Sequence, residues 1–209
     1  MNSSKVIAGL AALTCLTAIT MACLLAWLVH GVSSGANKLD EEKTQQAVQA
    51  MVSGLFESAS GLVMDNAQWD DAADNVYGQA NIQWILDTWG YSTENENYDV
   101  AVILDSAGKT IAAFSDGGTV EISAEALLGP GVGGLTDTLP KDGATFETAV
   151  GILKTSKGLV VAAAAPILPH SEDKKIPDAA PRVLIYAKTL TPDYVASLGK
   201  RLILDGLEL

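Results

Sequence analysis

A dense run of acidic and aromatic side chains is the clearest sign of chemistry in this sequence. Its members are Asp65, Trp69, Asp70, Asp71 and Asp74, followed by Trp84 and Trp89. Asp70 and Asp74 are four residues apart, so a helix would carry their carboxylates on one face. Oxygen ligands suit hard cations, but the spacing does not fit an EF-hand loop and lacks its glycine. The run therefore suggests a metal or amine site of another kind.

Two other interpretations of the run remain open. In the first, Trp69 is the wall of a ligand pocket and a carboxylate binds a donor group of the ligand. The binding residues would then be Trp69, Asp70, Asp71, Asp65 and Trp84. In the second, Trp69 fills the core where a long helix ends, and Asp65, Asp70 or Asp71 caps a helix or binds backbone amides. Composition alone favours this structural interpretation.

Enzymatic alternatives have little support in the sequence. The chain has two histidines, His30 and His170, and neither has a cysteine or carboxylate nearby in the sequence that suggests a triad. The glycine-rich stretch 129–134 lacks the lysine that ends a phosphate-binding loop. A hydrolase that uses the acidic cluster Asp65–Asp74 is the alternative function. We expect no catalytic residue, no bound metal and no cofactor.

The elements that must position the run begin with a long helix. Apolar residues recur at spacings of four and three over Asp40–Val63, namely Val48, Val52, Leu55, Ala59 and Leu62. Such a stripe either packs on its own domain or forms a dimer seam. We therefore name a homodimer, formed through the anchor and this helix, as the expected assembly.

Strand signals follow a polar loop at Ser92–Tyr98. The runs with strand character are 98–104, 110–114, 144–153, 158–167 and 181–190. Ser123 is expected to cap a short helix over 124–128, the glycines of 131–134 to form a flexible link, and Thr191-Pro192 to begin a last helix that ends near Arg201. Hairpin connections between consecutive strands predict an α+β fold, with an antiparallel sheet and helices on one side.

The N-terminus explains why an acidic chain has a mean hydropathy of +0.24. Residues 6–29 are apolar apart from Gly9 and three threonines, and as a helix they would span about 36 Å, enough to cross a bilayer. A cleavable signal peptide is the alternative, but its apolar region is usually shorter. The positive-inside rule leaves the N-terminus in the cytoplasm. We expect a tail at 1–5, a transmembrane helix at 6–29, a juxtamembrane segment at 30–37 and an extracytoplasmic domain at 38–209.

Charge and cysteine content exclude several classes of protein. The 25 acidic and 13 basic side chains give a net charge of −12, which argues against a nucleic-acid surface because phosphate binding needs clustered Lys and Arg. Both cysteines, Cys15 and Cys23, lie inside the expected anchor. The outer domain therefore cannot contain a disulfide.

The chain resembles the fourth subtype of the CHASE extracellular sensor domains. The resemblance rests on residues 65–71, which read Asp-Asn-Ala-Gln-Trp-Asp-Asp, and on later motifs. These motifs are the strands Val100–Leu104 and Thr110–Phe114 with Asp105 and Gly108 between them, the pairs Pro166-Ile167 and Leu190-Thr191, and the terminal run 198–202. It covers roughly residues 38–209.

The resemblance implies a Cache/PAS-like sheet behind a long helix and a sensor that binds a small ligand. In such proteins the sensor drives a cytoplasmic output, which is a diguanylate cyclase, a phosphodiesterase or a histidine kinase. No output domain and no second membrane segment occur in this sequence, so we expect an input role only, in a bacterial inner membrane. A protein-binding anchor is a further alternative.

Overall fold

The computed structural model describes residues 21, 43–94 and 97–201. The expected tail, the juxtamembrane segment and, apart from Met21, the expected transmembrane helix lie outside the described residues. The chain divides into two compact units, Met1–Gln49 and Ala50–Leu209. The second unit contains the whole sheet and the acidic run, and it is the unit described below.

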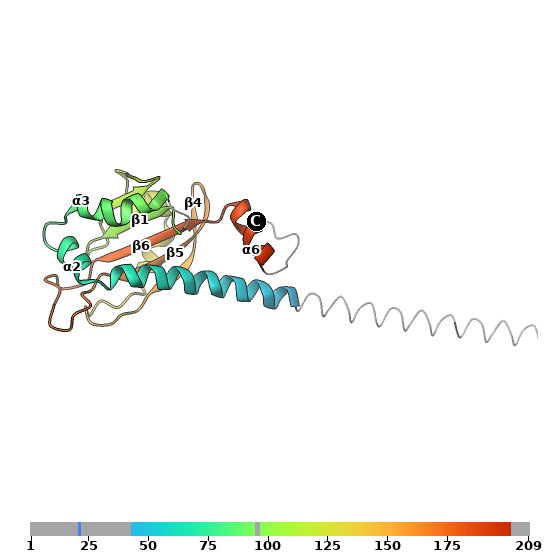
Figure 1. Cartoon of the computed structure of the whole chain (residues 1–209), viewed down its shortest axis with the longest axis horizontal. Coiled ribbons are helices and arrows are strands. Elements are labelled where there is room, and N and C mark those ends of the chain that lie inside the picture. Colours follow the sequence, from blue (N-terminus) through green and yellow to red (C-terminus); the bar gives the residue numbers. More distant parts are fainter. Residues whose placement is uncertain (1–20, 22–42, 95–96, 202–209) are drawn as a thin grey trace, which may run out of the picture. The chain divides into compact units, whose positions relative to one another are not determined.

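One antiparallel sheet of six strands forms the centre of the second unit, in the order β3-β2-β1-β6-β5-β4. The strands are β1 (Val100–Leu104), β2 (Thr110–Ser115), β3 (Gly118–Thr119), β4 (Ala149–Thr155), β5 (Gly158–Pro166) and β6 (Val183–Thr189). Figure 1 shows β1, β6 and β5 side by side. With the long helix before it, this sheet confirms the predicted α+β class.

The first face of the sheet is covered by the later turns (residues 56–67) of the long helix Lys43–Ala67 and by α2 (Asp70–Val76), α3 (Ile82–Ile85) and the π-helical turn η1 (Leu86–Gly90). Side chains of alternate strand residues, such as Ile103, Phe114 and Leu184, form a cluster with residues of these helices. A 3-10 turn, η2 (Tyr91–Glu94), follows η1 and replaces the beginning of the predicted loop. The acidic run therefore belongs to the layer on this face.

The second face is also covered, so the prediction of helices on one side was wrong. Here α4 (Ala124–Leu128) and α5 (Gly131–Thr136) pack on a separate apolar cluster that includes Val102, Ala162 and Ile185. The physical signal was present in the sequence, because β1 is apolar at all five positions. A strand with one solvated face alternates, whereas an uninterrupted apolar strand is buried on both faces.

Helix α5 corrects a second prediction, that of a flexible link at residues 131–134. Three glycines weaken a helix, yet Val132 is buried in the cluster of the second face and Leu135 packs against it. Packing of these two side chains therefore outweighs local propensity. By contrast, the predicted cap of α4 is confirmed, since the Ser123 hydroxyl accepts a hydrogen bond from the Ala126 amide at 3.2 Å.

The last helix, α6 (Pro192–Arg201), begins at the predicted residues, and the Thr191 hydroxyl accepts the Tyr194 amide at 3.2 Å. Its Val195 joins Val161 and Leu190 in a third cluster, against which Phe56 and Ala59 of the long helix pack. Strand β4 begins at Ala149, later than the predicted strand at 144. The third cluster joins the long helix, the sheet and α6.

Among the described residues, the helix Lys43–Ala67 is long and apolar enough to cross a membrane, judged by length and composition alone. Its last turns pack against the sheet, with Val63 and Ala67 fully buried. Ala59 and Leu62 of the predicted stripe also pack against the sheet cluster. That part of the stripe is therefore used within the domain, and the predicted dimer seam remains a prediction for the residues before it.

Candidate functional site

The acidic run lies where the long helix ends and the chain turns towards α2. Trp69 has an extended backbone and occupies the N-cap position of α2, with Asp70 and Asp71 in the first turn. The turn is joined to the end of β5, because the Leu168 amide donates to the Ala67 carbonyl at 3.1 Å. The run thus forms a corner between the long helix and the sheet.

Asp70 and Asp74 share one face of α2, as their spacing predicts, and both face the loop 169–180. Asp70 accepts hydrogen bonds from the Ser171 amide at 2.9 Å and from the Ser171 hydroxyl. The Lys174 ammonium lies 2.7 Å from Asp74 and 3.8 Å from Asp70. The predicted amine site is therefore occupied by a lysine of the chain itself.

Electrostatics at this corner follow from these contacts. Hydrogen bonds from the Ser171 hydroxyl and amide hold the pKa of Asp70 below its ordinary value. The hydrogen bond to Asp74 raises the pKa of Lys174. Both groups are therefore charged at neutral pH, and together with Ser171 they fasten the loop 169–180 to α2.

The other predicted carboxylates do not converge on this cluster. Asp65 and Asp71 are both exposed, Asp65 near the end of the long helix and Asp71 in the first turn of α2. Within the described ranges, no group of three or more His, Cys, Asp or Glu side chains is placed to hold a metal ion. The corner brings Asp70 and Asp74 together and leaves Asp65 and Asp71 at the surface.

The predicted tryptophans form a row that runs inward from the surface. The ring centroids of Trp69 and Trp84 are 5.5 Å apart, and those of Trp84 and Trp89 are also 5.5 Å apart. Trp69 is 40% exposed, whereas Trp89 is fully buried. The interpretation that Trp69 fills the core is therefore wrong, since Val63 and Ala67 are the buried residues at the helix end.

A second set of hydrogen bonds, made by Tyr77 and Arg182, holds the two ends of the loop 169–180, and no sequence pattern predicted it. The Tyr77 hydroxyl donates to the Ile167 carbonyl at 2.7 Å and accepts the Arg182 amide at 3.0 Å. Burial raises the pKa of Tyr77 to about 12, so the hydroxyl remains a donor. The Arg182 guanidinium binds Asp178 at 3.0 Å and the Gly78 carbonyl at 3.1 Å. No motif marks these residues, which are far apart in the chain.

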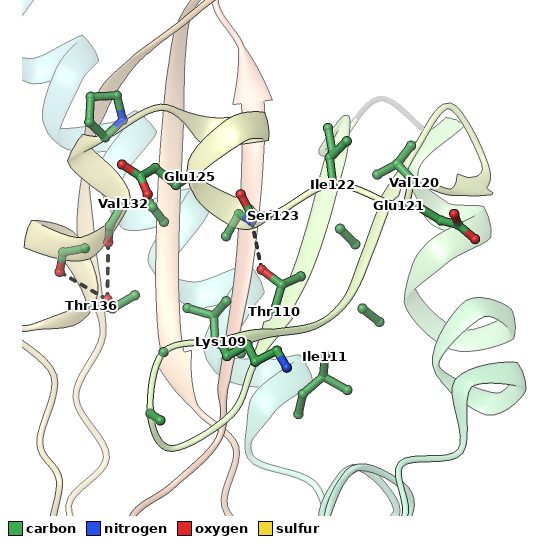
Figure 2. A pocket seen from close by; sticks show the side chains of 18 of the residues that line it. Lys109, Thr110, Ile111, Val120, Glu121, Ile122, Ser123, Glu125, Val132 and Thr136 are labelled. Carbon is green, nitrogen blue, oxygen red and sulfur yellow. Dashed lines mark hydrogen bonds between the residues drawn. The ribbon is translucent and has the colours of Figure 1, made fainter.

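An opening lies elsewhere, between the part of β2 that β3 leaves unpaired and the segment 120–137, and we call it the sheet-edge cavity (Figure 2). Its volume is about 780 Å³. The apolar lining includes Ile82, Leu104, Ile111, Val120, Ile122 and Val132. The polar lining includes Lys109, Thr110, Glu121, Ser123, Glu125, Thr136 and Asp137.

The cavity exists because β3 pairs with only the last part of β2. A turn with Asp116 and Gly117 at positive φ reverses the chain, and Phe114 pairs with Thr119. The Val120 amide still reaches the Ala113 carbonyl at 2.9 Å. Further along the segment, the Ala124 amide donates to the Thr110 hydroxyl at 2.8 Å, which Figure 2 shows beside Ser123. Between these contacts the chain leaves the edge of β2 open.

The charges around the cavity favour one kind of ligand. Glu121, Glu125 and Asp137 oppose a single cation, Lys109. The Thr136 hydroxyl donates to the carbonyls of α5 at 3.1 and 3.2 Å. Because carboxylates outnumber ammonium groups, the surroundings favour a neutral or cationic molecule over an anion. No sequence signal could have found this site, since its lining is spread over residues 82–137.

Comparisons with known proteins place the chain in a family. A family model described as the CHASE4 domain matches residues 56–209. Among solved structures, the extracellular domain of the histidine kinase vpHK1S-Z8 is similar, with 13% identity and a TM-score of 0.37, over 75% of this chain. The chain spans 62% of the length of that domain. The search of curated proteins found no match.

Proposed function

Because this chain belongs to the CHASE4 family of extracellular sensor domains, we propose that it is the sensing part of a membrane-anchored signalling protein and binds a small organic molecule in the sheet-edge cavity. The proposal includes an anchor at residues 6–29, a cytoplasmic N-terminus and an extracytoplasmic domain in the periplasm. The cytoplasmic signalling domain that this sensor controls is a diguanylate cyclase, a phosphodiesterase or a histidine kinase. Two copies of the chain associate as a homodimer.

The observation that carries the ligand proposal is the cavity itself. Sites for small molecules usually enclose about 300–1,000 Å³ and combine apolar walls with a few polar groups. The sheet-edge cavity has about 780 Å³ and both kinds of lining. The acidic corner supports this assignment less well, because Asp70 and Asp74 are already bound to the loop 169–180.

The ligand class follows from the lining. A body of small apolar or aromatic groups would contact Ile111, Ile122 and Val132, and an amine would be attracted by Glu121 and Glu125. An anion would meet more negative than positive charge. We therefore propose an apolar molecule with a primary amine.

A route from the cavity to the membrane connection runs across the sheet. Strand β2 pairs with β1, and β1 pairs with β6, which leads through Leu190 into α6. A ligand that separates β2 from the segment 120–123 would favour one arrangement of these strands. The ligand changes the position of α6 and the long helix only if it binds the separated arrangement of the strands with a different affinity from the unseparated one.

The test measures the unfolding midpoint of the full chain in detergent with two matched probes, phenethylamine and 3-phenylpropanoate. We expect the amine to raise the midpoint and the carboxylate to leave it unchanged, since binding to the folded state alone stabilises it. In the variant Ile122→Lys, which adds a cation to the cavity, the effect of the amine should disappear.

Ile152→Lys is the matched control, because Ile152 and Ile122 are 47% and 46% exposed and only Ile122 lines the cavity. This control should respond to the amine as the wild type does. An equal response of both lysine variants, or stabilisation by the carboxylate alone, would contradict the proposed site.

A further inference from the structure

The sheet-edge cavity borders a stretch of β2 that β3 does not reach. Among the described residues, β3 pairs with Phe114 and Ser115 of β2, whereas β2 begins at Thr110. Beyond β3, the Val120 amide still donates to the Ala113 carbonyl. Residues 110–112 therefore form an open strand edge, and an extended segment can add to such an edge through backbone hydrogen bonds.

The cavity reaches around this edge to both faces of the sheet. Ile111 packs against the cluster of the first face, whereas Val132 is buried in the cluster of the second face and Val120 packs against it. All three side chains line the cavity. Successive side chains of an extended segment point to opposite faces. A segment beside β2 would therefore place one side chain near Ile111 and the next near Val120 and Val132.

Two more isoleucines of the lining leave apolar surface for an occupant to cover. Ile82, at the beginning of α3, is 41% exposed, and Ile122, which follows β3, is 46% exposed. Contact with a bound segment would remove both side chains from water, which is favourable for apolar surface. The lining thus offers apolar contacts to several side chains of one occupant.

Two hydrogen bonds limit the length of the occupant. The Val120 amide meets the Ala113 carbonyl at 2.9 Å at one end of the open edge, and the Ala124 amide meets the Thr110 hydroxyl at 2.8 Å at the other (Figure 2). Three residues of an antiparallel strand extend about 10 Å. The space between the two contacts therefore suits a segment of about three residues.

The register of β2 also favours a short occupant. Ile103 of β1 pairs with Ala112, but the next residue, Leu104, pairs with Thr110, so Ile111 is an extra residue in β2. Such a bulge interrupts continuous pairing and bends the strand. A long strand of a second copy of the chain would be unable to follow this edge, whereas a short free peptide can lie beside it.

Carboxylates around the cavity favour a peptide with a free N-terminus. Glu121, Glu125 and Asp137 outnumber Lys109 in the lining. A free N-terminal amine is largely protonated at neutral pH, because its pKa is about 8. The local charge therefore attracts the start of a peptide and repels acidic side chains.

We propose that the sheet-edge cavity binds a short peptide of about three residues, with a free N-terminal amine and apolar side chains, as an added strand beside β2. Backbone hydrogen bonds to residues 110–112 supply affinity, and the apolar lining on the two faces selects the alternate side chains. This inference rests on the proposed function. It narrows the ligand from an apolar molecule with a primary amine to a peptide.

The test measures the affinity of the full chain in detergent for Val-Phe-Val-amide by isothermal titration calorimetry. Two matched peptides carry a methyl group on one backbone nitrogen, that of the phenylalanine or that of the last valine. Successive amides of a strand point to opposite neighbours, so one methyl group removes the bond to β2 and the other does not. We expect one methylated peptide to bind at least about fivefold more weakly than the other.

Three further measurements accompany this comparison. The N-acetylated peptide should bind several-fold more weakly, because it lacks the charged amine. Ile122→Lys should abolish binding of the free peptide, whereas Ile152→Lys, which lies outside the cavity lining, should retain it. A 13C label at the phenylalanine carbonyl should show the infrared shift of a carbonyl that joins a sheet.

Equal affinity of the two methylated peptides, or a labelled carbonyl whose band does not move on binding, would overturn the added strand. Binding of the acetylated peptide as tight as that of the free one would overturn the requirement for an amine. A peptide affinity that falls as the protein concentration rises would assign the open edge to a second copy and also overturn the proposal.

Phenethylamine separates this inference from the proposed function. If phenethylamine raises the unfolding midpoint and the two methylated peptides bind equally, the cavity is a small-molecule site and only the added strand is wrong. If neither phenethylamine nor Val-Phe-Val-amide binds, the assignment of the cavity as the ligand site is itself wrong.

Discussion

Asp70 and Asp71 are neighbours in the sequence but have different environments. Asp70 accepts two hydrogen bonds from Ser171, a residue of the loop 169–180, whereas Asp71 is exposed. The difference follows from their positions on α2, since consecutive residues of a helix point in different directions. Asp70 therefore holds the loop 169–180 against α2, and the ion pair between Lys174 and Asp74 adds a second contact between them.

Removal of the Asp70 carboxylate should release this loop. We expect Asp70→Ala to increase the rate of tryptic cleavage after Lys174 and Lys175 several-fold, because a loop without its anchor opens more often. Asp71→Ala is the matched control and should leave the rate unchanged. Equal effects of the two substitutions would show that the carboxylates act in the same way and contradict this role.

At the scale of elements, α4 and α5 are joined by a connection that allows little variation. Gly129 has a φ of +84°, and an added Cβ would overlap the Lys154 carbonyl oxygen of β4. Gly134 lies inside α5, and an added Cβ there would meet no atom within 4 Å. The fold therefore requires glycine at position 129, whereas it tolerates a larger side chain at position 134.

Alanine substitutions should separate the two glycines by the sign of the change in stability. We expect Gly129→Ala to reduce the free energy of unfolding by at least about 2 kcal/mol, from backbone strain and overlap. Gly134→Ala should increase it by about 0.5–1 kcal/mol, because alanine favours a helix more than glycine does. Chemical denaturation of the full chain measures the free energy of unfolding of both variants. A decrease for Gly134→Ala would contradict the open space beside α5.

At the scale of the whole molecule, pairing of charges links stability to pH. Asp99 precedes β1 and contacts the end of β6, where Lys188 donates at 2.6 Å and the Thr189 amide at 2.7 Å. Burial raises the pKa of Asp99, but these hydrogen bonds outweigh it and hold the pKa below the ordinary 3.8. A depressed pKa stabilises the fold above pH 3.8, and this contribution is lost as pH falls through the folded-state pKa.

We expect Asp99→Asn to reduce the free energy of unfolding by about 1–2 kcal/mol at neutral pH, as loss of charged hydrogen bonds does. The difference from the wild type should begin to narrow below about pH 4, where the carboxylate of the unfolded chain becomes protonated, and should be lost once pH falls below the lower pKa of the native carboxylate. Asp137→Asn is the control, because Asp137 and Lys141 form an exposed pair at 3.7 Å, worth little at the surface. A difference at Asp99 that is independent of pH would contradict the role of its charge.

Much of the architecture depends on residues that lie close together in the chain, and such features can be predicted from the sequence. Periodic apolar residues predicted the long helix, Ser123 and Thr191 predicted two helix starts, and hairpin connections predicted the antiparallel sheet. The spacing of Asp70 and Asp74 placed them on one helix face. The motif at residues 65–71 indicated the resemblance to the CHASE4 family. Each of these inferences needs only local geometry, which the chain carries in its own order of residues.

The partners of the candidate residues come from distant parts of the chain, so the sequence does not predict them. Lys174 lies next to Asp74 although 100 residues separate them, and no local pattern encodes such a contact. Packing of Val132 made a helix from glycines that predict a link. The sheet-edge cavity depends on where β3 leaves β2. Such contacts arise between segments distant in the chain, and only the folded arrangement brings those segments together.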